Sequence, residues 1–329
     1  MRRGLRIGLQ LAVSGGLIGF LIWKIDLGKT VDYIASSNPL YVAVAVAIYT
    51  LSLLPMAWRW QVLLASKGMH EPFAWLTKLY LIGYAASQVL PTGVGGDAVR
   101  IVEHARRRPD RKGEAAGAVL MERVVGSAGI LLVVAVGLVL ALGRYDNIGA
   151  FVWVEVACVV ALVVFGLLLF SQRAYAFLQE RIFSRGTGVW LQRALRSVWT
   201  ALHGYRWEKR ALGLALAVSV VVQFVRMLAI WLCGEAVGID VSPLVYIMLG
   251  PLLFLVTMVP ITVNGLGVRE SFFVFFLDRF GVSADAAFAA GFLFFAVTIA
   301  AALPGGLILA WRSVRGGLRV GEPARVRPR

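Results

Sequence analysis

The feature that most constrains this chain is a set of long apolar stretches with few or no charged side chains. They cover residues 7–25, 40–58, 115–142, 150–170, 211–237 and 284–311. A helix of about 20 apolar residues crosses the roughly 30 Å hydrocarbon core of a bilayer. Only 16% of the residues are charged, against about 25% in soluble domains. The sequence therefore predicts an all-α polytopic membrane protein and excludes a soluble enzyme.

Two further apolar runs, 73–90 and 243–259, are each followed by a stretch rich in proline and glycine. Short cytoplasmic loops carry an excess of lysine and arginine. By this rule we assign to the cytoplasm both termini, the segment between Arg59 and Lys78, and the basic run 106–112. A single crossing at 73–90 would place two of these basic regions on opposite sides. We therefore expect six full transmembrane helices plus two oppositely oriented re-entrant hairpins, one at each apolar run.

The two proline- and glycine-rich stretches share a pattern. Residues 91–100 read PTGVGGDAVR and residues 260–269 read PITVNGLGVR, which agree as P-x-x-V-x-G-x-x-V-R. The same offset of 169 residues, from Pro91 to Pro260, superposes the apolar runs of the two halves, 40–142 and 209–311. An odd number of crossings separates the halves, so the repeat is predicted to be inverted. Inverted repeats with interrupted apolar segments indicate a transporter.

The charge of the chain, +15, lies mostly between the apolar runs. An anionic inner leaflet suits this placement, and we expect no nucleic-acid partner. Residues 173–210 combine apolar side chains at helical spacing with arginines, which predicts an interfacial amphipathic segment. We assign residues 1–315 to a single membrane domain and residues 316–329 to a basic cytoplasmic tail.

The proline- and glycine-rich turns are the candidate site. Glycines let backbone amides approach a ligand, a helix N-terminus binds phosphate, and arginine recognises it with two parallel hydrogen bonds. Glu122 and Arg123, inside the run 115–142, are expected to face the first hairpin. The candidate residues for binding a lipid headgroup or phosphate are Gly93, Gly95, Gly96, Asp97, Arg100, Glu122, Arg123, Asn264, Gly265, Gly267, Arg269 and Glu270.

An alternative assigns these charges to structure. Asp97 would pair with Arg100, and Arg269 would pair with Glu270, without contacting a substrate. We interpret Arg226, with Gln223 one turn before it, as a structural residue. Two cysteines within apolar runs and three scattered histidines predict no metal site and no cofactor.

Taken together, Pro91 with the GDAVR sequence at 96–100, the Glu122–Arg123 pair and the NGLGVRE sequence at 264–270 resemble the lysylphosphatidylglycerol synthase transmembrane-region family. This flippase-like family is similar to the lipid-flipping half of bacterial multiple-peptide-resistance proteins. The resemblance covers roughly residues 5–315. It implies movement of phospholipids, aminoacylated lipids, hopanoid-related lipids or polyprenyl-linked sugars.

Two departures from the family pattern affect these expectations. No aminoacyl-transferase domain follows residue 311, so we do not expect lipid aminoacylation from this chain. The acidic residue that often follows the Glu-Arg pair is absent, and Gly126 and Ser127 occupy its neighbourhood.

We expect a lipid translocator, a flippase or scramblase of a bacterial cytoplasmic (inner) membrane that moves a phospholipid or polyprenyl-phosphate-type lipid. No GxxxxGK[ST] motif occurs, which argues against ATP drive by this chain. We do not expect an enzyme. Two alternatives stay open: a membrane enzyme acting on polyprenyl or phospholipid substrates, and a membrane partner of a lipid- or glycolipid-synthesising enzyme.

Overall fold

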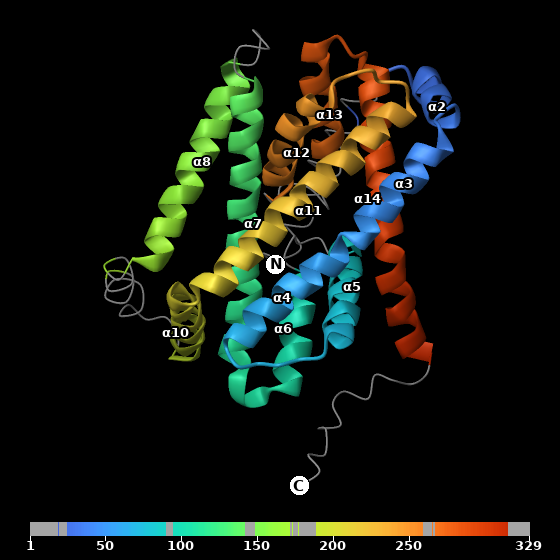
Figure 1. The fold of residues 1–329 in the computed structure, drawn as a ribbon. Coiled ribbons are helices and arrows are strands. Elements are labelled where there is room, and N and C mark those ends of the chain that lie inside the picture. The colour runs from blue at the N-terminus through green and yellow to red at the C-terminus, as the bar shows by residue number, and fades with distance from the viewer. Residues whose placement is uncertain are drawn as a thin grey trace.

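In the computed structural model, the described residues are 19, 25–89, 95–141, 149–171, 173, 177, 189–258, 265 and 267–314. Within these ranges the chain is helical and forms no strand (Figure 1). The helices, in chain order, are α2 (Leu27–Ala35), α3 (Pro39–Leu51), α4 (Leu53–Ser66), α5 (Phe73–Val89), α6 (Gly95–Arg107), η1 (Pro109–Arg111), α7 (Lys112–Ala141), α8 (Gly149–Phe170), α10 (Val189–Gly204), η2 (Tyr205–Trp207), α11 (Lys209–Ala236), α12 (Pro243–Met258), α13 (Val268–Leu277), η4 (Asp278–Phe280) and α14 (Ala284–Val314).

Four helical segments of the described chain are long and apolar enough to cross a membrane. They are Pro39–Ser66, Pro109–Gly137, Lys209–Ala236 and Ala284–Arg312. The first joins α3 to α4 through Ser52. The expected span at 150–170 corresponds to the apolar helix α8, and nearly all of the expected span at 7–25 lies outside the described residues.

Short local signals place the ends of these helices. The side chain of Asn38 accepts a hydrogen bond from the Leu40 amide at the start of α3, where Pro39 occupies a position that needs no donor. α4 and α11 end in the same way, at Gly68 and Gly238, whose φ angles are 70° and 77°. This left-handed conformation is readily available only to glycine and is typical of a helix C-terminus.

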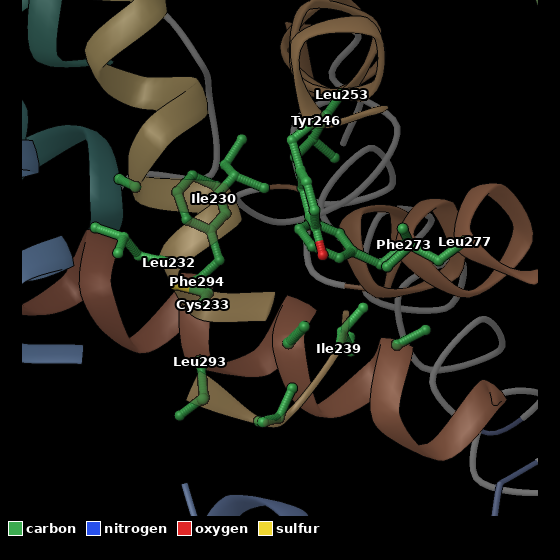
Figure 2. Packing of buried hydrophobic residues seen from close by; sticks show 14 of the residues in the cluster. Ile230, Leu232, Cys233, Ile239, Tyr246, Leu253, Phe273, Leu277, Leu293 and Phe294 are labelled. Atoms are coloured by element: carbon green, nitrogen blue, oxygen red, sulfur yellow. The ribbon is translucent and has the colours of Figure 1, made fainter. Parts of the chain in front are cut away.

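The buried apolar side chains form two clusters. The larger one joins α3, α11, α12, α13 and α14, with Tyr246, Phe273 and Phe294 among its fully buried side chains (Figure 2). The smaller one joins α4, α5 and α7, and the residues Leu202 and Tyr205 of the 189–207 segment also belong to it. The candidate site lies where the elements of these two clusters meet.

Opposite ends of the bundle carry different contacts. At one end the amide of Asp26 donates to Asp285, and the amide of Asn38 donates to the carbonyl of Ala236. At the other end Glu71 pairs with Arg107 and Arg108. The basic segments of the described chain therefore gather at one end, where α10 and the beginning of α7 also lie (Figure 1).

The predicted amphipathic segment is described over α10 and η2, and most of 173–188 lies outside the described residues. α10 packs against α7 where a Cβ on Gly113 or Gly117 would overlap Ser197 or Ala201. Tyr205 donates from its hydroxyl to the carbonyl of Leu63, at 2.9 Å. Burial raises the pKa of this phenol, so it stays protonated and keeps donating.

Candidate functional site

Glu122 lies at the centre of the site, on α7, with only 1% of its surface exposed. Its carboxylate accepts hydrogen bonds from Arg59 Nη2 at 2.8 Å and from Arg100 Nη1 at 2.9 Å. It also accepts from the Tyr80 hydroxyl at 3.0 Å. The three donors come from α4, α6 and α5, so one carboxylate connects four helices. A charge in this setting is tolerated because it is paired and hydrogen-bonded.

Asp97 forms the second acidic centre, in the first turn of α6. Its carboxylate accepts from Arg100 Nη2 at 2.9 Å and from Arg123 Nε. The positive end of the α6 dipole also stabilises a carboxylate at this position. Arg100 therefore bridges Asp97 and Glu122, and it stacks on the rings of Trp60 and Tyr80 at 4.8 and 4.3 Å.

Arg59 corrects one expectation from the sequence. We predicted that it follows the span at 40–58 and lies in the cytoplasm, and this is wrong. α4 continues to Ser66, and Arg59 is buried within it, donating to Ser219 Oγ at 2.7 Å as well as to Glu122. The apolar pattern continues past the arginine, and one buried carboxylate suffices to keep a cation inside a helix bundle.

Arg226 on α11 is also part of the site, although the sequence suggested only a structural role. Its Nη2 lies 2.9 Å from the sulfur of Met56, and its guanidinium faces the rings of Tyr49 and Phe254 at 5.2 and 5.5 Å. Its Nε is buried and has no hydrogen-bond partner within the part of the chain that the structure describes. No ion pair joins Arg226 to a carboxylate among the described residues, so this cation differs from Arg59 and Arg100.

Gln223 precedes Arg226 by one helical turn and is 6% exposed. Its side-chain oxygen is buried and has no hydrogen-bond partner in the described part of the chain. The sequence signal for both residues was a pair of polar side chains at i and i+3 inside an apolar run.

These side chains line a cavity of about 290 Å³ between α4, α5, α6, α7, α11 and α12. A second cavity, of about 120 Å³, adjoins it and includes Gly83, Tyr84, Ser87 and Gly96. Both cavities are lined by Tyr80, Asp97, Arg100 and Arg123. The lining of the larger cavity comprises Met56, Arg59, Tyr80, Asp97, Arg100, Glu122, Arg123, Gly126, Ser127, Ile130, Ser219, Val222, Gln223, Arg226 and Phe254. We call it the arginine cavity.

Glycine allows α5 and α6 to approach closely beside this site. A Cβ on Gly96 would overlap the carbonyl of Gly83, and a Cβ on Gly83 would come within 2.9 Å of the carbonyl oxygen of Gly96. Gly95 is the first residue of α6. Gly93 lies outside the described residues.

The second motif forms a separate arrangement at the start of α13. Gly265 and Gly267 have φ angles of 73° and 83°. The Gly267 amide donates to the Glu270 carboxylate at 2.7 Å, and Arg269 Nε donates to the same carboxylate at 3.1 Å. Arg269 also lies 4.7 Å from the ring of Phe295. Asn264 lies outside the described residues.

The two motifs do not line one cavity. Neither Arg269 nor Glu270 is among the residues that line the arginine cavity or its neighbour. Both ion pairs of the structural alternative, Asp97 with Arg100 and Arg269 with Glu270, are present. In the described ranges, no three His, Cys, Asp or Glu side chains gather in a way that could hold a metal ion.

Comparison with known proteins identifies similar chains. The family model described as "Lysylphosphatidylglycerol synthase TM region" matches residues 7–306. A UPF0104 membrane protein of Methanothermobacter thermautotrophicus is 24% identical over 304 residues, which cover 86% of this chain and 88% of that protein.

Proposed function

The chain belongs to the lysylphosphatidylglycerol synthase transmembrane-region family, and from this premise we propose that it translocates a phosphate-bearing lipid. The phosphate group binds in the arginine cavity while the acyl or prenyl chains stay in the bilayer. The family is one of membrane domains, and the helices of this chain suit an integral membrane protein.

One observation carries this proposal: the arginine cavity holds more positive than negative charge. Four arginines line it (Arg59, Arg100, Arg123 and Arg226), and two carboxylates do so (Asp97 and Glu122). Ionisable side chains inside a membrane protein are costly and usually functional. An unbalanced cluster is costlier than a neutral one, and a bound anion removes the imbalance. Arginine suits this role because its planar fork matches phosphate oxygens.

We propose that the second motif binds the same headgroup at the other leaflet. Its arginine is buried, and Nη2 of Arg269 has no hydrogen-bond partner among the described residues. The similar turns that end α4 and α11 support the inverted repeat that would place the motifs at opposite faces. The clustering of basic segments at one end supports a topology in which both termini lie on the cytoplasmic side of a bacterial inner membrane. In this proposed topology the chain has six full spans and two re-entrant hairpins.

The open alternatives make different demands. A partner of a lipid-synthesising enzyme needs a docking surface but no charged cavity inside the membrane. An enzyme acting on lipid diphosphates through a metal needs carboxylates free to ligate it, whereas Asp97 and Glu122 are both bonded to arginines. We therefore favour translocation.

Replacing Arg226 tests the proposed function, because this arginine has no carboxylate to strand. In vesicles of phosphatidylcholine doped with fluorescent phosphatidic acid and phosphatidylglycerol, Arg226→Gln should slow lipid movement between leaflets by about tenfold or more, the value of one charge-assisted hydrogen bond. Arg226→Lys should restore movement only in part. The matched control is Arg106→Gln, which removes an exposed arginine paired with Glu103. Movement at wild-type rates in both Arg226 variants would contradict the proposal.

A further inference from the structure

We infer that the arginine cavity selects a lipid whose headgroup is a phosphate monoester, and discriminates against headgroups that carry an ammonium. This inference rests on the proposed function and specifies its substrate. Phosphatidic acid and a polyprenyl phosphate share the relevant chemistry, a terminal phosphate that carries up to two negative charges.

The first step is the charge of the cavity. Four arginines oppose two carboxylates, which leaves two positive charges without a counter-charge among the described residues. The neighbouring stretches 90–94 and 259–264 contain no Asp, Glu, Lys or Arg. A phosphate monoester has a second pKa near about 6 and carries roughly −1.5 to −2 at pH 7. It therefore balances the cavity, while a phosphodiester leaves one positive charge unbalanced.

The second step concerns what an ammonium would find there. Both carboxylates already accept hydrogen bonds from arginines, Glu122 from two and Asp97 from two. A lysyl ester or an ethanolamine headgroup would bring its ammonium beside these four guanidinium groups, where each carboxylate is already shared with two of them. Like charges brought together in a partly desolvated site strongly disfavour a wrong partner.

The third step identifies Gln223 as the residue that keeps the cavity positive. It lines the cavity and lies on α11 one turn from Arg226, which forms no ion pair with a carboxylate of the described residues. Its side-chain oxygen is buried and has no hydrogen-bond partner in the described part of the chain, so Gln223 adds a neutral acceptor to the cavity where a carboxylate would add a negative charge. A glutamate here would have nearly the same shape and would supply the missing counter-charge for Arg226.

The test compares headgroup preference in wild type, Gln223→Glu and Gln223→Met. Phosphatidylcholine vesicles would contain one fluorescent lipid at a time: phosphatidic acid, a polyprenyl phosphate, phosphatidylglycerol, phosphatidylethanolamine or lysylphosphatidylglycerol. The rate of movement between leaflets is the readout. Wild type should move at least one of the two monoester lipids about tenfold faster than the two ammonium lipids. A tenfold ratio of rates corresponds to a difference of about 1.4 kcal/mol in activation free energy.

The variants make the inference sharper. Gln223→Glu should lower the rate for monoester lipids about tenfold and shift the preference toward phosphatidylglycerol, since one positive charge then remains. Gln223→Met removes the amide without adding charge, so its ratio of monoester to ammonium-lipid rates should stay clearly above that of Gln223→Glu even if both rates fall. If only one of the two monoester lipids moves, the result also shows whether the transported lipid carries acyl chains or a prenyl chain.

The failure of this inference can be told apart from failure of the proposed function. If the wild type moves ammonium lipids as fast as monoester lipids, or if Gln223→Glu leaves the preference unchanged, the selectivity is wrong and translocation stands. If no lipid moves in any vesicle although Tm values confirm folded protein, the proposed function itself is wrong, and the inference falls with it.

Discussion

The two proline- and glycine-rich motifs have similar sequences but hold their arginines in different ways. In the first, Arg100 reaches across to Glu122 on α7 and shares that carboxylate with Arg59 of α4. In the second, Arg269 bonds to its own neighbour, Glu270, which also caps α13. The first motif therefore ties several helices together, while the ion pair of the second joins two neighbouring residues of one helix.

This difference shows that two similar sequence motifs can surround their arginines with different charged partners. At the sequence offset of 169 residues that relates the motifs, the position of Glu122 corresponds to Gly291. Gly291 packs against Phe273 and the backbone of Glu270. The first half therefore contributes a carboxylate where the second contributes close packing, and the excess positive charge of the arginine cavity includes Arg226 from the second half.

The largest effect should follow the loss of the shared carboxylate. Glu122→Gln leaves Arg59 and Arg100 buried without their common counter-charge, and breaking a buried ion pair in this way costs about 3–5 kcal/mol. The free energy of unfolding, or Tm in detergent, should fall accordingly. Glu103→Gln, which removes an exposed carboxylate paired with Arg106, should cost no more than about 1 kcal/mol. Equal stability of the two variants would show that Glu122 does not hold the helices together.

A medium effect is expected from filling the glycine contacts of the two halves. Gly96→Ala forces its Cβ into the backbone of Gly83, and such overpacking costs about 1–3 kcal/mol. Gly291→Ala meets the ring of Phe273 at 3.3 Å and the Cα atom of Glu270 at 3.5 Å, and should be milder. Gly213→Ala on α11, where nothing lies within 4 Å, should be neutral or stabilising. Thermal melting of the three variants checks this order, and a reversed order would mean that the first hairpin is not packed backbone to backbone.

Glu270→Gln should have a smaller effect than Glu122→Gln. The glutamine can still accept from the Gly267 amide, and one buried arginine rather than two loses its carboxylate, so the expected cost lies near the lower end of the range of about 3–5 kcal/mol for a broken buried ion pair. A cost as large as that of Glu122→Gln would erase the distinction between a shared and a local ion pair. The double variant Arg269→Gln/Glu270→Gln should recover part of the stability if the pair is purely structural.

Much of the helical architecture could be predicted from the sequence, because length and hydropathy determine which segments can cross a membrane. The runs at 40–58, 115–142, 211–237 and 284–311 each correspond to a long apolar helix. The helix boundaries were less accurate at Arg59, since a charge was taken as the end of a span. A hydropathy pattern contains no information about a counter-charge on another helix.

The candidate site was predictable only in part for the same reason. Asp97, Arg100, Glu122 and Arg123 were recognised, and the structure brings them together around two adjoining cavities. Arg59 and Tyr80 are not predicted as site residues, and Arg226 and Gln223 are interpreted only as structural ones, because the local sequence does not show what these side chains face on other helices. Their role depends on contacts 42 to 170 residues apart along the chain, such as Tyr80 with Glu122 and Arg226 with Met56.

The contact between Gly83 and Gly96 has a consequence for how the site keeps its dimensions. Where two helices touch through side chains, their spacing varies with rotamers and with each substitution. Here main chain lies on main chain, so the separation of α5 and α6 is set by peptide geometry alone. The backbone from which Arg100 extends toward Asp97 and Glu122 is therefore held at a defined distance from α5. These helices can slide, pivot about the glycines or move apart, but their backbones cannot come closer together at this contact.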